Sequence, residues 1–145
     1  MSSFEKIIEV RWQDCDANGH VRHSAYYDYG AHARIRFFNQ CGFGSAELKE
    51  LGIGPVLFKE ECAFIKELHL NDTISINILK GELEDNGRKW ILHHEIFDQQ
   101  HTKCAQITAQ GSWLDLNSRR LTYPPKALVQ ALDSLPLGDF YVYKK

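Results

Sequence analysis

The chain has 145 residues, the length of one ordinary domain, which is enough to bury a sizeable core. Hydrophobic residues at 43% and charged residues at 25% are close to globular averages and exclude the disordered and collagen-like classes. The formal net charge of −2 argues against a protein that binds nucleic acid through bulk positive charge.

The N-terminal sequence and the cysteines indicate the compartment. The first ten residues, MSSFEKIIEV, lack the apolar segment and cleavage site of a signal peptide, and no apolar run approaches the length of a membrane span. The four cysteines stand far apart, without a C-x-x-C pair, so neither a zinc site nor a disulfide scaffold is indicated. We therefore expect a cytoplasmic protein with free thiols and no membrane partner.

The first third of the chain predicts a strand, a polar loop and two helices. Residues 4–12 alternate loosely, as in an opening strand, and residues 14–23 form the polar loop. A long helix is expected to begin at an N-cap on Ser24 and to end before Gly42. A short second helix is expected over residues 46–51.

The long helix carries a stripe with small residues at its centre. The stripe consists of Tyr26, Gly30, Ala33, Phe37 and Cys41. Gly30 costs the helix about 1 kcal/mol relative to Ala, so we expect a packing reason for it. Small residues let another backbone come close, as when a sheet wraps around a helix.

Strand patterns fill the chain after residue 55. The expected strands are residues 56–68, 73–79, 89–97 and 103–116. Asp85-Asn86-Gly87 is a strong hairpin signal. A helix from Pro124 to about Leu132 follows. Because helices and strands are segregated, we expect an α+β fold, with a single domain over residues 1–135 and a C-terminal tail over residues 136–145.

The polar loop and the following helix resemble a known family. The pattern D-x-D-x-x-G-H-V, then Tyr-Tyr in a long helix, is similar to the start of the hot-dog fold and, more narrowly, to acyl-CoA thioesterases of the 4-hydroxybenzoyl-CoA thioesterase type. The matching residues are Asp14, Cys15, Asp16, Gly19, His20, Val21, Tyr26 and Tyr27. The resemblance covers roughly residues 5–116, although only the first quarter of the chain is rich in motif residues.

The resemblance implies a structure and a reaction. It implies a curved antiparallel sheet wrapped around one long central helix, and a homodimer with the two sheets side by side and active sites at the interface. Pairs of such dimers often form tetramers. Asp16 takes the position of the catalytic carboxylate, and the helix-start N–H groups around His23 that of the thioester-polarising donors. Many relatives have an aromatic or Asn-Asn pair where Arg22-His23 stands here.

Hydrolysis of an acyl- or aroyl-CoA thioester needs few groups. A carboxylate acts as nucleophile or general base, amides hold the oxyanion, and an apolar slot takes the acyl chain. Asp16 is the expected carboxylate. Residues expected to position the loop or the oxyanion are Asn18, Gly19, His20, His23 and Ser24. Residues expected to bind the acyl-CoA or acyl-carrier-protein substrate are Tyr26, Phe58, Lys59, Phe64 and Arg88.

Several alternatives remain open. Asp16 could instead organise the loop as an Asx-turn, and His20 could orient it by hydrogen bonds. The loop also matches part of an EF-hand, but Ala25 stands where the bidentate Glu is required. For zinc, His20 and His23 lack a third ligand at a supporting spacing, so no metal and no cofactor are expected. A non-catalytic acyl-thioester binding protein and a hot-dog dehydratase or hydratase are the alternative functions.

Overall fold

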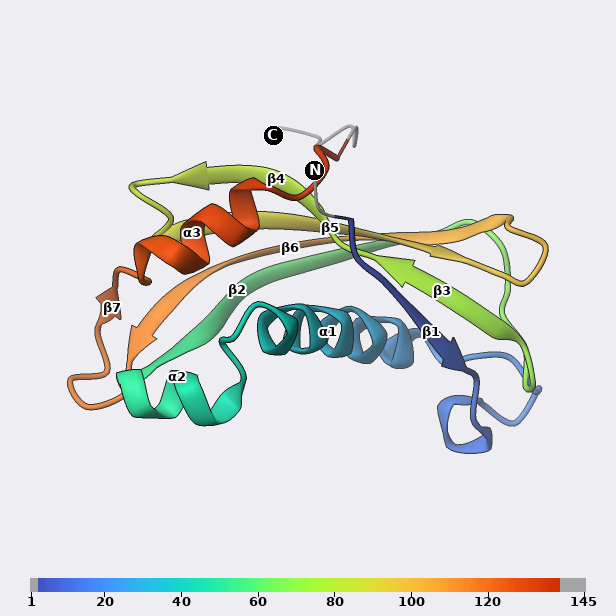
Figure 1. The fold of residues 1–145 in the computed structure, drawn as a ribbon. Helices are drawn as coiled ribbons and strands as arrows, with labels where there is room; N and C mark the ends of the chain where they lie inside the picture. Colours follow the sequence, from blue (N-terminus) through green and yellow to red (C-terminus); the bar gives the residue numbers. More distant parts are fainter. Residues whose placement is uncertain (1–2, 139–145) are drawn as a thin grey trace.

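The computed structural model describes residues 3–138 of the chain. Within that range it contains three α-helices and one antiparallel sheet of seven strands (Figure 1). In chain order the elements are β1 (Glu5–Glu9), the 3-10 helix η1 (Trp12–Asp14), α1 (His23–Gln40), α2 (Ser45–Leu51), β2 (Ile53–Phe64), β3 (Thr73–Asn77), β4 (Leu79–Glu84), β5 (Lys89–Phe97), β6 (Lys103–Asp115), β7 (Leu121–Thr122) and α3 (Lys126–Asp133).

The sheet curves over the long helix. Its strand order is β1-β3-β5-β6-β2, with β4 added on β5 and β7 on β6. In Figure 1, α1 lies beneath the arch of the sheet and α3 lies on the other side, near β4. This confirms the expected α+β class and the sheet wrapped around one central helix. Within residues 3–138, no helix combines the length and apolar character needed to cross a membrane.

Small residues hold α1 close to the sheet, as their pattern predicted. Gly30 and Ala33 are buried on the inner face of α1, and Ala105 and Ala109 are fully buried on β6. A Cβ atom added to Gly30 would lie 3.3 Å from His94 and 3.4 Å from Ile107, on β5 and β6. The packing reason expected for Gly30 is therefore this close approach of helix and sheet.

The strand expected over residues 73–79 is divided into β3 and β4, which pair with the same neighbour. β3 pairs with the Phe97 end of β5, and β4 pairs with the His93 and Lys89 part of β5. The register shifts between Lys80 and Leu83, where the backbone of Ile91 comes close to Gly81. The predicted turn at residues 85–87 joins β4 to β5, with Asp85, Asn86 and Gly87 all at positive φ.

Two boundaries differ from the expectation. The helix α1 begins at His23 with Arg22 as N-cap, so Ser24 is the second helical residue and not the cap. Residues 136–138 do not simply begin a tail, because Pro136 and Gly138 exchange backbone hydrogen bonds of 2.8 Å with Lys80. The remainder of the expected tail, residues 139–145, lies outside the described residues.

Candidate active site

The loop that carries the D-x-D pattern is a tight turn folded around the carboxylate of Asp16. Oδ1 of Asp16 accepts hydrogen bonds from the backbone N–H of Asn18 at 2.9 Å and of His20 at 3.2 Å. Gly19 has a φ of +80°, a conformation that favours glycine. The Asx-turn considered for Asp16 is therefore present. It fixes one oxygen of the carboxylate and orients the other.

Asp14 anchors the same loop from inside the protein. It is buried, and its Oδ2 accepts hydrogen bonds from the Arg11 N–H at 3.2 Å and the Tyr29 hydroxyl at 2.9 Å. Burial alone raises the pKa of Asp14, but these hydrogen bonds outweigh it and hold the pKa below its usual value. Asp14 is thus an ionised structural anchor of the loop.

The start of α1 follows the loop directly and is not capped by a side chain. The chain turns from Val21 through Arg22 into His23, and Arg22 N–H donates to the Asp14 carbonyl at 2.9 Å. Within residues 3–138, no side chain hydrogen-bonds to the first N–H groups of α1. The first N–H groups of a helix lack intrahelical partners and carry the positive end of its dipole. Ala25 N–H donates to the Arg22 carbonyl at 3.0 Å. The N–H groups of His23 and Ser24 are therefore the ones available to an anion or a polarised carbonyl oxygen.

A pocket of about 370 Å³ joins the loop to the helix start. Its lining residues are Asp16, His20, Val21, His23, Tyr26, Phe64, Ile65, Lys66 and Glu67. Five of the residues predicted from the sequence, namely Asp16, His20, His23, Tyr26 and Phe64, are thus brought together. Asp16 is exposed at the rim of this pocket in the single chain.

The apolar wall of the pocket comes from α1 and the end of β2. The rings of Tyr26 and Phe64 meet edge to face with centroids 4.9 Å apart. Burial raises the pKa of Tyr26 to about 12, so its hydroxyl stays protonated at neutral pH. Phe64 remains 53% exposed, which leaves one face of its ring open to a ligand. The polar side chains of Asp16 and His20 line the same pocket.

The other predicted site residues lie elsewhere. Asn18 and Gly19 are in the turn, and Ser24 is exposed at the helix start. Phe58, Lys59 and Arg88 are not part of the pocket. Phe64, which lines the pocket with Asp16, pairs with Ala105 of β6. Lys89, the residue after Arg88, pairs with Ser112, seven residues further along β6. Seven residues of strand span about 23 Å, which separates Arg88 from Asp16 within one chain.

Phe58, Lys59 and Arg88 have other local roles. Phe58 is 58% exposed at a bulge in β2, and Lys59 forms an exposed ion pair with Glu61 at 2.8 Å. Arg88 pairs with Asp85 at 2.6 Å and lies over the ring of Tyr123. A single chain therefore gives no common site for these three residues and Asp16.

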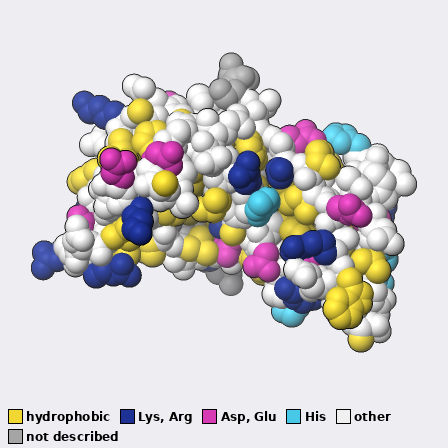
Figure 2. All heavy atoms as spheres, turned by 60° about the horizontal axis from the view of Figure 1, so that its bottom comes forward, with side chains coloured by type: hydrophobic (Ala, Val, Ile, Leu, Met, Phe, Trp, Pro, Cys, Tyr) yellow, Lys and Arg dark blue, Asp and Glu magenta, His cyan; other side chains and the backbone are white. Residues whose placement is uncertain are grey.

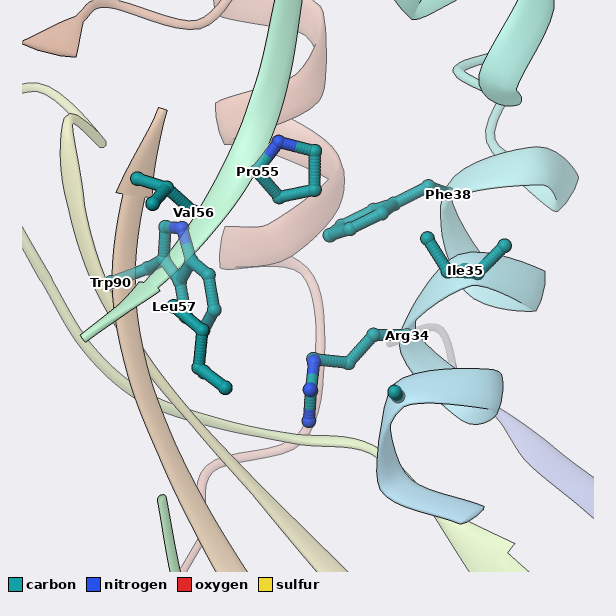
Figure 3. A pocket seen from close by; sticks show the side chains of 8 residues that line it. Arg34, Ile35, Phe38, Pro55, Val56, Leu57 and Trp90 are labelled. Carbon is teal, nitrogen blue, oxygen red and sulfur yellow. The ribbon is translucent and has the colours of Figure 1, made fainter. Parts of the chain in front are cut away.

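A second cavity, of about 260 Å³, lies between α1 and β2 (Figure 3). Apart from Arg34 its lining is apolar, with Ile35, Phe38, Leu57 and Trp90 among the residues of the wall. Figure 3 shows the guanidinium of Arg34 reaching from α1 into the space between the helix and β2. Figure 2 views the molecule from the α1 side, where hydrophobic side chains reach the surface between charged ones.

Arg34 belongs to a buried polar cluster beneath α1. Its Nη1 lies 3.0 Å from Nε2 of His94, and its Nη2 lies 3.5 Å from Glu60. Nδ1 of His94 is 2.7 Å from the carbonyl oxygen of Asn77, so Nδ1 carries the proton and Nε2 accepts from Arg34. Burial and the neighbouring Arg34 lower the pKa of His94 to about 3. His93 points to the opposite face, where Nδ1 lies 2.9 Å from the Thr108 hydroxyl.

Sequence reasoning missed part of the pocket. Ile65 and Glu67 line it although neither stood out in the sequence, and the side chain of His20 lies 3.2 Å from Glu67 rather than on Asp16. Glu67 belongs to the segment between β2 and β3, 47 residues after His20. The strand expected over residues 56–68 included both Ile65 and Glu67, but no local pattern linked that strand to the loop of Asp16.

An antiparallel sheet curved around one central helix, with a turn carrying D-x-D before that helix, defines a hot-dog-fold protein. The chain belongs to the thioesterase-like superfamily, because the model of that family matches residues 10–132.

Solved structures share the fold over most of the chain, and a relative in sequence matches half of it. A solved structure from Staphylococcus aureus, in complex with CoA, has a TM-score of 0.87 and 15% identity, covering 98% of this chain and 90% of that one. A gentisyl-coenzyme A thioesterase has a TM-score of 0.79 and 25% identity, covering 88% of this chain and 98% of that one. A protein of Aquifex aeolicus named "Putative esterase" is 31% identical over 74 residues, which are 51% of this chain and only 58% of the relative.

Proposed function

We propose that this protein hydrolyses the thioester bond of an acyl- or aroyl-CoA, with Asp16 as the carboxylate that attacks the carbonyl carbon or activates water. One observation carries the proposal: Asp16 and the uncapped start of α1 border the same pocket. A thioester in this pocket meets a carboxylate and unpaired amides together, which is the minimum that its hydrolysis needs.

The local hydrogen bonds give each group a separate task. The N–H groups of Asn18 and His20 hold Oδ1 of Asp16, so Oδ2 is the oxygen left for the reaction. The N–H groups at His23 and Ser24 stabilise the oxyanion that develops as the carbonyl is attacked. Tyr26 and Phe64 hold the apolar part of the acyl group. The carbon–sulfur bond then breaks and the coenzyme A thiolate leaves. If Asp16 has activated water, the acyl group leaves as the free acid; if Asp16 has attacked, water hydrolyses the resulting Asp16 anhydride to the same acid.

The relatives support a coenzyme A thioester as the substrate. The chain belongs to a thioesterase-like superfamily, one neighbour was solved in complex with CoA, and another is a gentisyl-coenzyme A thioesterase. That second neighbour favours an aroyl group, which fits a slot lined by Tyr26 and Phe64. We propose a cytoplasmic location, since all four cysteines, which fall within the described range, are free thiols.

We further propose that the working form is a homodimer joined along β2. This strand has 12 residues, stands at one edge of the sheet order and exposes Leu57, Phe58 and Phe64. Long apolar edges favour pairing with another strand. Antiparallel pairing of two β2 strands about a two-fold axis near residue 61 sets Phe58, in the middle of one strand, beside Phe64 at the end of the other. Phe58 of one copy would then lie beside the pocket that contains Phe64 and Asp16 of the other.

Release of free thiol from a panel of acyl- and aroyl-CoA substrates tests the proposal, with Asp16→Asn as the decisive variant. We expect its kcat to fall by about 10²–10⁴-fold, the usual contribution of a positioned acid or base. Asp28→Asn is the matched control, because Asp28 is an exposed acid in the first two turns of α1. Wild-type turnover by Asp16→Asn would remove Asp16 from the reaction. Saturable CoA-ester binding without thiol release by the wild type would indicate a binding protein.

A further inference from the structure

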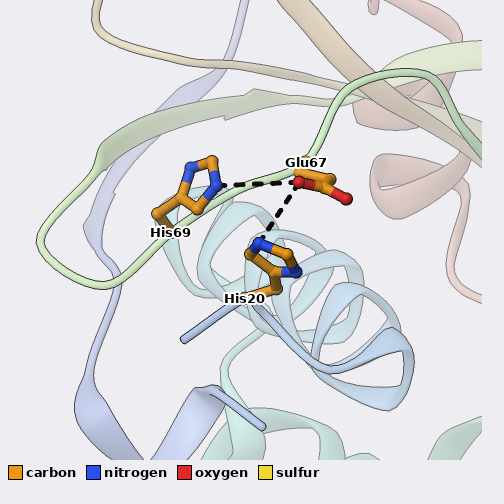
Figure 4. Close-up of side chains that lie close together, drawn as sticks. All are labelled: His20, Glu67 and His69. Carbon is orange, nitrogen blue, oxygen red and sulfur yellow. Dashed lines mark ion pairs between the residues drawn. The ribbon is translucent and has the colours of Figure 1, made fainter. Parts of the chain in front are cut away.

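Three potential metal ligands from two distant parts of the chain meet beside the candidate active site. His20 belongs to the loop before α1, and Glu67 and His69 belong to the segment between β2 and β3 (Figure 4). Nε2 of His20 lies 3.2 Å from Oε2 of Glu67, and Nε2 of His69 lies 3.7 Å from the same oxygen. One ligand atom from each residue falls within 4.8 Å of both others.

Backbone pairing holds these residues in place. His20 and His69 face each other in an isolated antiparallel bridge. On either side of it, Val21 N–H donates to the Leu68 carbonyl at 2.8 Å and Leu70 N–H donates to the Gly19 carbonyl at 3.3 Å. Glu67 and His69 are two residues apart in extended chain, so their side chains leave on the same side. The arrangement is therefore set by the backbone and not only by flexible side chains.

The distances and the donor set fit zinc. Bonds of 2.0–2.2 Å in tetrahedral geometry separate neighbouring ligand atoms by about 3.3–3.6 Å. The two separations from Glu67, 3.2 and 3.7 Å, bracket that range, and all three ligand atoms lie within 4.8 Å of one another. Two imidazole nitrogens and one carboxylate oxygen form a donor set used for zinc with a fourth position left for water.

The carboxylate of Asp72 contacts His69 on its Nδ1 side, away from Glu67. Asp72 Oδ2 accepts the backbone N–H of His69 at 2.8 Å and lies 3.7 Å from its Nδ1. A carboxylate beside Nδ1 favours the tautomer with the proton on Nδ1, which leaves Nε2 free to bind a metal. Nε2 is also the atom that His69 directs at Glu67.

We propose that His20, Glu67 and His69 bind a divalent transition-metal ion of the zinc type. The ion would tie the loop of Asp16 to residues 67–69 at the edge of the pocket, which contains His20 and Glu67. The proposal departs from the sequence-based expectation of no metal site, and it does not depend on thioester hydrolysis. The competing explanation is that His20 and His69 simply form ion pairs with Glu67.

Titration of chelator-treated protein with ZnCl₂ in a calorimeter tests the site. Glu67→Gln and His69→Gln each remove one ligand, and both residues are exposed, so these variants are expected to fold. The matched controls are Glu61→Gln, on exposed β2, and His32→Gln, on the exposed face of α1. CoCl₂ is the second probe, because its absorption spectrum separates nitrogen and oxygen ligands from cysteine thiolates.

We expect one zinc ion per chain, a raised thermal unfolding midpoint with zinc, and a cobalt spectrum without a thiolate charge-transfer band. Zinc affinity should fall at least about tenfold in Glu67→Gln and in His69→Gln and stay unchanged in both controls. Equal zinc affinity in the wild type and the two ligand variants overturns the proposal. So does a wild type that takes up no zinc, or a cobalt spectrum dominated by thiolate ligands.

Discussion

The two aspartates of the loop show how neighbouring positions take different tasks. Asp14 is buried and held by Arg11 and Tyr29, whereas Asp16 is exposed at the rim of the pocket and held by two backbone N–H groups. In extended chain, residues two apart point to the same side. The short helix η1 ends at Asp14 and breaks that relation, so the first carboxylate turns inward and the second outward.

At the same scale, a buried histidine makes stability depend on pH. Burial and the neighbouring Arg34 lower the pKa of His94 to about 3, so the folded protein keeps it neutral. The unfolded chain takes up a proton on His94 below its ordinary pKa of 6.5. Between pH 6.5 and about 3, protonation therefore favours the unfolded state, by roughly 1 kcal/mol per pH unit from this group.

Urea unfolding of the wild type and of His94→Gln at about pH 7.5 and about pH 5 measures this contribution, because both pH values lie about one unit or more from the ordinary histidine pKa. We expect the variant to be less stable at neutral pH, because Arg34 and the Asn77 carbonyl lose a partner. We also expect its stability to fall less than the wild type's on acidification. Parallel losses in the two proteins would show that His94 does not cause the wild-type dependence.

Individual residues were predictable where a local pattern named them. The D-x-D-x-x-G-H pattern identified Asp16, Gly19 and His20, because the turn that joins them is built from neighbours in sequence. Glu67 and His69 were not predictable, because they reach His20 only through the pairing of residues 67–70 with the loop. That pairing depends on where β2 ends and the chain turns back.

At the scale of elements, α1 and β6 agree with their sequence patterns. In each element the buried residues recur at regular spacing and include small residues. The sequence of each element therefore indicated which of its faces packs against the other. β5 was also predicted with its observed bounds, Lys89–Phe97. The division of β3 from β4 had no local signal, since it follows from the bulge at Lys80–Leu83 against β5. The N-cap of α1 was wrongly predicted at Ser24. Serine is a good capping residue, but Ser24 is the second residue of a helix whose N-cap is Arg22.

The close contact of α1 with the sheet predicts a sharp response to added volume. Ala33 is fully buried on the inner face of α1, so Ala33→Leu overpacks the interface and should lower the free energy of unfolding by about 1–3 kcal/mol. Ala46→Leu makes the same change at an exposed helical position of α2 and should alter it by less than about 0.5 kcal/mol. Denaturant unfolding compares them. Equal effects would mean that α1 packs more loosely than the structure indicates.

At the scale of the whole molecule, the two edge strands of the sheet differ in length and in how many large apolar side chains they expose. β2 has 12 residues with Leu57, Phe58 and Phe64 exposed, whereas β1 at the other edge has five residues and exposes Ile7. The proposed dimer through β2 predicts that Phe58→Asp yields monomers and loses activity although Asp16 is intact. Ile7→Asp is the control, because Ile7 is 57% exposed and Phe58 is 58% exposed.

Light scattering after size-exclusion chromatography measures the result. The wild type and Ile7→Asp should have at least twice the chain's mass of 16.7 kDa, and Phe58→Asp should have that mass once. A wild type that is monomeric and active would contradict the proposed dimer. A Phe58→Asp variant that is still dimeric would place the contact elsewhere.

The strand order also governs what a growing chain can do as it leaves the ribosome. β1 cannot pair until β3 has been synthesised, since Glu5 pairs with Asn77. β2 cannot pair until β6, which lies between it and β5, has been synthesised. The apolar side of α1 is therefore without its cover for most of synthesis, and such exposed surface invites aggregation. A nascent chain that stalls before Lys103 contains α1 and five of the seven strands, and it lacks β6, the strand that joins β2 to the rest of the sheet over the helix.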